Sequence, residues 1–224
     1  MRQSLVLGAL AVLAADRSAA AQDSADRIAR DGDAPAAVEL ERSPARRPVP
    51  PNSLSLLAGV YTRAYWGQSF SIADVAYEPN FVLGVISGTD LVRTSWGLTI
   101  GHESGIALRF GTSISLEMWR GITVSFGARQ IGGWVLTPQV ILGLSTISNM
   151  IGVEAERELQ ALLGGEGDSD RLIYLGSELG SSLEAVPDVE VFYRLHHRSG
   201  LLGLWGNVEA DHNANAVGIR LRYD

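Results

Sequence analysis

The sequence predicts an all-β fold, an eight-stranded antiparallel transmembrane β-barrel of the bacterial outer membrane, from three observations. Eight segments after residue 52 alternate apolar with small or polar residues, which is the period of strands that face two different environments. Several of these segments are longer than the five or six residues usual in soluble strands. The N-terminus also has the features of an export signal.

The predicted strands are residues 53–66, 80–91, 95–110, 113–126, 134–148, 171–183, 188–199 and 214–223. Segment 95–110 shows the alternation most clearly, because Trp96, Leu98, Ile100, Ile106, Leu108 and Phe110 share one face. Tilted strands of this length suit an apolar layer of about 25–30 Å. Aromatic residues gather near segment ends, as at membrane interfaces: Tyr65, Trp66, Trp96, Trp134, Tyr174 and Tyr223.

The region before the barrel divides into two parts. Residues 1–21 read as a signal peptide, with Arg2, an apolar stretch over residues 5–15 and small residues at 19–21. Residues 22–52 are rich in Ala, Asp, Arg and Pro without apolar periodicity, which predicts a flexible periplasmic linker. The barrel would then occupy residues 53–224.

Composition restricts the class of partner and the source of stability. The net charge is −7, and it becomes about −8 once Arg2, Asp16 and Arg17 leave with the signal. An acidic chain argues against nucleic acid as a partner. The chain has no cysteine, which excludes disulfides and thiolate metal sites.

The connections predict which way the barrel points. The joins around residues 91–94 and 184–187 are short, whereas those over 67–79, 149–170 and 200–213 are longer. Outer-membrane barrels keep short turns on the periplasmic side and long loops outside. Loop 149–170 should hold a short helix over 153–163, and its Asp168 and Asp170 are interpreted as a solvated acidic stretch.

The alternation also predicts the interior of the barrel. An eight-stranded barrel is filled by side chains and is not an open pore. Buried charges must compensate one another. The predicted inward-facing charged residues are Glu103, Arg109, Glu117, Glu178, Glu190 and Arg194.

One polar group stands out at the end of the seventh predicted strand. His197 and Ser199 continue the outward face of Val191, Tyr193 and Leu195, because residues two apart point the same way. Asp211, Asn213 and Asn215 extend the outward face of the next strand.

A serine, a histidine two residues away and an acidic or amide group are the parts of an activated nucleophile. At the edge of the apolar belt, such a group would meet the ester carbonyls of an acylated glycolipid. His196 and Arg198 point inward instead, and no pair of histidines has metal-ligand spacing, so no metal or other cofactor is expected.

The run "VFYRLHHRSG" followed by "GNVEADHNANAVGIRLRY" resembles the C-terminal strand pair of the PagL family of outer-membrane lipid A deacylases. The resemblance implies Ser199 as the nucleophile, His197 as the base and Asn207 at the oxyanion site. Gly200 stands where family members often carry asparagine, and backbone amides near it are expected to join Asn207 at the oxyanion site. An ungapped count matches Asp211 to the third catalytic member. Alignment on the terminal "VGIRLRY" matches Asn215 instead, so both remain open.

The expected function is therefore a carboxylic ester hydrolase that removes an acyl chain from lipid A of lipopolysaccharide in the outer leaflet. The sequence leaves a homodimer open. The alternatives are a non-catalytic barrel with a structural or adhesive role at the cell surface, and a soluble periplasmic lipid-binding barrel.

Overall fold

The structure is a computed structural model that describes residues 49–163, 170–200 and 211–224. The predicted signal peptide and residues 22–48 of the predicted linker lie outside the described residues, so both assignments stay predictions. The elements are β1 (Asn52–Thr62), β2 (Tyr77–Arg93), β3 (Leu98–Phe110), β4 (Ile114–Phe126), β5 (Arg129–Ile131), β6 (Trp134–Ile147), α1 (Gly152–Leu163), β7 (Arg171–Leu183), β8 (Val186–Ser199) and β9 (Asp211–Tyr223).

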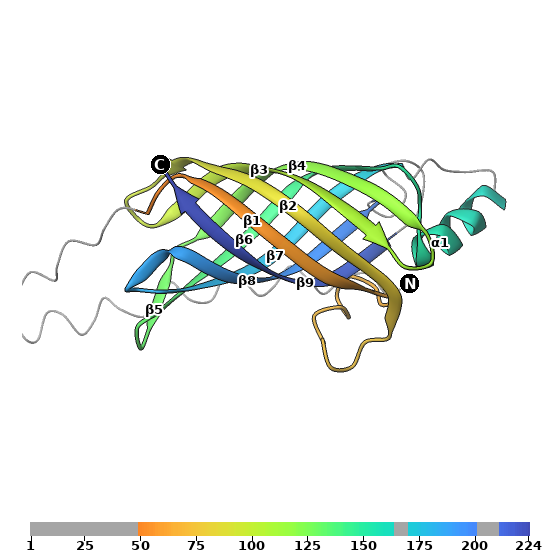
Figure 1. The fold of residues 1–224 in the computed structure, drawn as a ribbon, viewed down its shortest axis with the longest axis horizontal. Coiled ribbons are helices and arrows are strands. Elements are labelled where there is room, and N and C mark those ends of the chain that lie inside the picture. Colours follow the sequence, from red (N-terminus) through yellow and green to blue (C-terminus); the bar gives the residue numbers. More distant parts are fainter. Residues whose placement is uncertain (1–48, 164–169, 201–210) are drawn as a thin grey trace, which may run out of the picture. The chain divides into compact units, whose positions relative to one another are not determined.

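Eight long strands form a closed antiparallel barrel (Figure 1). Each pairs with its neighbour in sequence, β1 pairs with β9, and β4 pairs with β6 to complete the ring. All eight predicted segments are confirmed as strands. The short β5 was not predicted, and it pairs only with the start of β6, as an extension of the hairpin between β4 and β6.

The two faces of the barrel wall differ as the alternation predicted. Large apolar side chains remain exposed on the outward face of every long strand, with Leu83 54%, Met118 54% and Leu142 60% exposed. An apolar surface of this extent, around the whole barrel, is stable in lipid and not in water. The chain is therefore an outer-membrane β-barrel, and the soluble lipid-binding alternative is wrong.

The two ends of the barrel are unlike. At the loop end lie the β1–β2 and β3–β4 connections and α1, together with the ends of β6 and β8 and the starts of β7 and β9 (Figure 1). At the terminal end, Asn52 of β1 pairs with Tyr223 of β9. No helix among the described residues is long and apolar enough to cross a membrane. The predicted helix over 153–163 is confirmed as α1, which begins one residue earlier.

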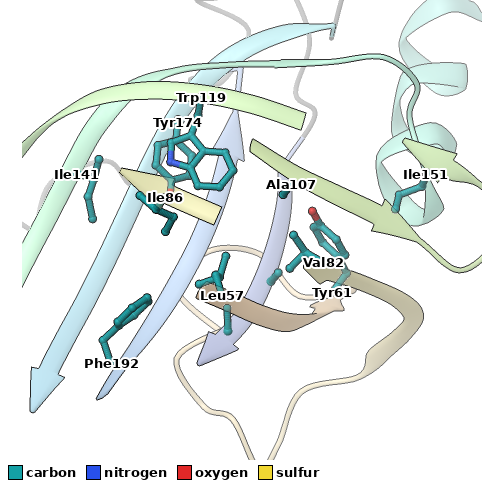
Figure 2. Close-up of a cluster of buried hydrophobic side chains, with 12 residues drawn as sticks. Leu57, Tyr61, Val82, Ile86, Ala107, Trp119, Ile141, Ile151, Tyr174 and Phe192 are labelled. Carbon is teal, nitrogen blue, oxygen red and sulfur yellow. The ribbon is translucent and has the colours of Figure 1, made fainter. Parts of the chain in front are cut away.

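A cluster of buried apolar and aromatic side chains fills part of the interior (Figure 2). Trp119 and Tyr174 lie together there, with ring centroids 5.5 Å apart. Tyr174 had been expected in the interfacial girdle, and that expectation is wrong, because its ring is fully buried inside the barrel. It falls on the inward face of β7, beside buried Leu172 and Gly176.

Buried ion pairs occupy another part of the interior, and the predicted charge compensation is confirmed. Arg194 pairs with Glu103 at 2.7 Å and with Glu178 at 2.5 Å. Arg220 joins Glu178 at 2.7 Å and also contacts Glu190. Because each arginine bridges two carboxylates, the buried charges compensate one another. This interior leaves no room for a transport channel of the kind that larger barrels have.

Candidate active site at the loop end

The candidate site lies on the outward face of three adjacent strands at the loop end. Antiparallel pairing places His197 of β8 opposite Asn213 of β9, and Asn213 opposite Thr62 of β1. His197 is 4% exposed and Asn213 is fully buried. Although they face away from the lumen, the chain around them shields them from the surroundings.

The segment after β1 provides this cover. The Nδ2 of Asn213 donates to the carbonyl oxygen of Ala64 at 2.8 Å. The ring of Trp66 lies 6.1 Å from the His197 ring, centroid to centroid, and packs edge-on against Phe70 at 5.3 Å. The two aromatic residues, 36% and 45% exposed, form an apolar wall beside the imidazole.

A short hydrogen bond fixes the His197 ring. Its Nδ1 lies 2.6 Å from the Oδ1 of Asn213. Because the Ala64 carbonyl can only accept, the amide NH₂ must face Ala64 and the amide oxygen must face the ring. The neutral imidazole therefore carries its proton on Nδ1 and donates it to Asn213. Nε2 is then the basic nitrogen.

Ser199 follows His197 on the same outward face. It pairs with Ile173 of β7 and with Asp211 of β9, and it is 8% exposed. Residues two apart along a strand have Cα atoms about 6.6 Å apart. A hydroxyl and an imidazole at that spacing can share a proton.

The three candidates for the third member differ in their described contacts. Asn213 contacts His197. Asn215 is two residues further into the barrel wall, where its Oδ1 accepts from the Tyr193 hydroxyl at 2.7 Å and its Nδ2 donates to the Tyr77 hydroxyl at 3.2 Å. The backbone of Asp211 pairs with Ser199, but its side chain lies outside the described ones.

The expected oxyanion residues are only partly within the described chain. Gly200 is buried directly after β8, so its backbone lies next to Ser199. Asn207 lies outside the described residues, and its role stays a prediction. No group of three or more metal-binding side chains occurs within the described ranges.

The inward-facing neighbours of this site belong to a different network, as the alternation predicted. His196 contacts Glu117 at 3.0 Å and the Tyr174 hydroxyl at 3.2 Å. Arg198 is fully buried and contacts Glu154 of α1. Successive residues of β8 therefore alternate between the lumen and the candidate site.

Sequence reasoning missed the contributions of Ala64 and Trp66. Trp66 had been assigned to the aromatic girdle, and Ala64 offered no signal because it acts through its backbone carbonyl. These residues reach the site by pairing of β1 with β9, which brings the start of the β1–β2 connection over Asn213.

No protein-family model matches the chain, and no curated protein sequence matches it. Several solved outer-membrane structures have a similar fold. Neisserial surface protein A matches 77% of this chain and 97% of its own, with 13% identity and a TM-score of 0.47. The outer membrane enzyme PagL matches 76% of this chain and 99% of its own, with 12% identity and a TM-score of 0.48.

The attachment invasion locus protein Ail of Yersinia pestis matches 79% of this chain and all of its own, with 13% identity and a TM-score of 0.36. The three names include an enzyme, a surface protein and an attachment protein, so these similarities do not separate catalytic from non-catalytic roles. The class is an eight-stranded outer-membrane β-barrel. Its chemistry has to be argued from its own residues.

Proposed function

We propose that the chain is an outer-membrane ester hydrolase that removes an ester-linked acyl chain from lipid A. The observation that carries this proposal is the oriented His197 ring. Asn213 holds Nδ1 at 2.6 Å and is itself held by Ala64, while Ser199 shares the same face of β8. A polar strand end needs no such orientation of an imidazole, whereas a general base does.

The reaction would proceed through an acyl-enzyme. The Nε2 of His197 takes the proton of the Ser199 hydroxyl as the oxygen attacks the ester carbonyl. The imidazolium that forms is stabilised by the Asn213 amide oxygen. His197 then gives the proton to the departing alcohol. In the second half, His197 takes a proton from a water molecule that attacks the acyl-enzyme ester. The proton passes to Ser199 as the fatty acid leaves.

The developing negative charge on the carbonyl oxygen needs donors. We assign this role to the Asn207 side chain, following the resemblance in sequence, and to the Gly200 backbone amide, which directly follows Ser199. Preorganised donors of this kind are among the largest contributions to acyl-transfer catalysis. No cofactor enters the mechanism.

The position of the site supports a lipid substrate. His197 and Ser199 lie at the loop end of the outward face of the barrel wall. Closer to the middle of the strands, this face is apolar and exposed at Val191 and Val217. The long connections at the same end point to the outside of the cell. Ester carbonyls of an acylated glycolipid in the outer leaflet would lie at this boundary, and Trp66 and Phe70 provide an apolar wall for an acyl chain.

The test is the mass of lipid A from a bacterium with fully acylated lipid A that expresses the full chain. Wild-type protein should reduce the lipid A mass by one acyl group. Ser199→Ala should abolish that change while the folded barrel keeps its heat-dependent shift on gels. An unchanged lipid A mass, despite folded protein in the outer membrane, would reject hydrolysis and leave a non-catalytic surface barrel.

A further inference from the structure

We propose that Glu154 is a positioning residue for the candidate active site: it seats α1 in the mouth of the barrel, and α1 in turn holds the segment that orients Asn213. The inference rests on the proposed function in that Asn213 is the partner of the catalytic base. It concerns residues to which neither the sequence pattern nor the site geometry had assigned a role.

The first step is the seat of α1 inside the barrel. Glu154 is fully buried, and its two carboxylate oxygens contact Arg109 of β3 and Arg198 of β8. In the ring of eight strands, β3 and β8 are four places apart in either direction. One carboxylate from the helix therefore links opposite walls of the barrel.

The start of α1 is fixed by further contacts. The backbone N–H of Val153 donates to the Glu78 Oε2 at 3.1 Å, and Ile151 is part of the buried cluster inside the barrel (Figure 2). Gly152 has φ +60°, and a Cβ there would lie 1.7 Å from the Glu78 Oε2. Only glycine permits this close approach of the chain to Glu78.

The second step is the contact of the next helical turn with the segment after β1. Glu156 pairs with Arg63 at 2.8 Å, and the Arg157 guanidinium donates to the Arg63 carbonyl at 3.4 Å. The same guanidinium lies 4.8 Å from the centre of the Tyr65 ring. α1 thus contacts the residues on both sides of Ala64.

The third step connects this segment to the base. The Ala64 carbonyl accepts from Asn213, and Asn213 accepts from His197. A displaced Ala64 would remove the contact that selects the orientation of the Asn213 amide. Positional errors of about 1 Å in such groups can reduce rates by about 10²-fold.

The two attachments of α1 differ in strength. The Arg63–Glu156 pair is exposed, with side chains 51% and 58% accessible, and exposed pairs contribute little. The Glu154 contacts are buried, and breaking one leaves uncompensated charge. The position of α1 should therefore depend on Glu154 and only weakly on Glu156.

The experiment compares Glu154→Gln with Glu156→Gln, the same change two residues along the helix, in the full chain folded into detergent micelles. Because the chain has no cysteine, Gln68→Cys gives a single spin-label site in the β1–β2 connection. Glu154→Gln should increase the mobility of that label and lower kcat at least about tenfold with KM within about twofold. Glu156→Gln should change neither beyond about twofold, because the exposed pair contributes little and Arg157 keeps its contacts with Arg63 and Tyr65.

Gly152→Ala tests the same idea with every charge retained, and it replaces Glu154→Gln if that variant does not fold. It should mobilise the label and lower kcat in the same way. Unchanged label mobility in the folded variant would overturn the inference. Increased mobility with an unchanged kcat would also overturn it, because α1 would then hold the segment without affecting the base. If the wild-type protein hydrolyses no ester, the proposed function fails, while the label still tests the seat of α1.

Discussion

At the residue scale, the candidate site depends on the orientation of one amide. Asn213 faces both His197 and Ala64, and the carbonyl of Ala64 determines which end of the amide meets the ring. The alternation of β8 was sufficient to predict that His197 and Ser199 share a face. It left Asp211, Asn213 and Asn215 open as the third member, because the pairing register of β8 with β9 depends on a long connection that the sequence does not constrain.

Replacement of Asn213 by alanine should therefore remove the group that holds His197 in the tautomer that the proposed mechanism requires. We expect kcat on an ester substrate to fall by about 10²–10⁴-fold, as when the orienting member of a triad is altered. Asn213→Asp should retain more activity, because a carboxylate still accepts from Nδ1. Initial rates of fatty acid release in detergent measure both effects.

Asp211→Asn and Asn215→Ala are the controls for this prediction. Asn215 contacts Tyr193 and Tyr77, so its loss should leave kcat within a few fold. A fully active Asn213→Ala variant together with an inactive Asp211→Asn variant would move the third role to Asp211.

At the element scale, strands were predictable and connections were not. In a closed barrel every strand residue faces either lipid or lumen, so the alternation of apolar and polar residues in the sequence is sufficient to predict each long strand. The β1–β2 connection has no such pattern, and the positions of Ala64 and Trp66 follow from which strands close the ring. β5 escaped prediction because three residues are too few to show a period.

The β5–β6 turn gives a prediction that is independent of the site. Ile131 pairs with Trp134 across the turn. The two residues between them, Gly132 and Gly133, have φ angles of +56° and +85°. A two-residue hairpin turn of type I′ requires positive φ at both positions. Gly133→Ala should destabilise the hairpin by about 1–2 kcal/mol, whereas Gly133→Asn should cost less. Hydrogen exchange at the Arg129–Ile131 amides should accelerate in the alanine variant alone.

This hairpin lies at the terminal end of the barrel, so hydrolysis at the loop end should not change. A loss of activity in Gly133→Ala that matched the loss of exchange protection would show that the two ends are coupled.

At the scale of the whole molecule, the barrel is held by an apolar exterior in lipid and by paired charges in its interior. The six charged residues predicted to face inward are all buried. Their ion-pair partners could be predicted only in part. Further members of the network come from other elements: Arg198 from β8, Arg220 from β9 and Glu154 from α1. Sequence alternation gives the face of a residue, but ring closure decides which residues meet across the lumen.

Glu178 tests how much the interior charges stabilise the fold. It accepts from Arg194 at 2.8 Å and from Arg220 at 2.7 Å, and so joins β7, β8 and β9. Glu178→Gln keeps the shape but leaves buried positive charge uncompensated, so we expect unfolding to become easier by about 3–5 kcal/mol. Glu184→Gln, the same change in an exposed turn, should shift stability by no more than about 0.5 kcal/mol.

Urea unfolding in detergent, followed by the gel shift of the folded barrel, measures both variants. The folded fraction of Glu178→Gln should hydrolyse esters at the wild-type rate, because Glu178 contacts none of the groups that hold His197. Equal unfolding midpoints for the two variants would mean that water reaches the interior and screens the buried pairs. The buried pairs would then contribute little, and the stability of the barrel would depend on its lipid-facing surface and on strand pairing.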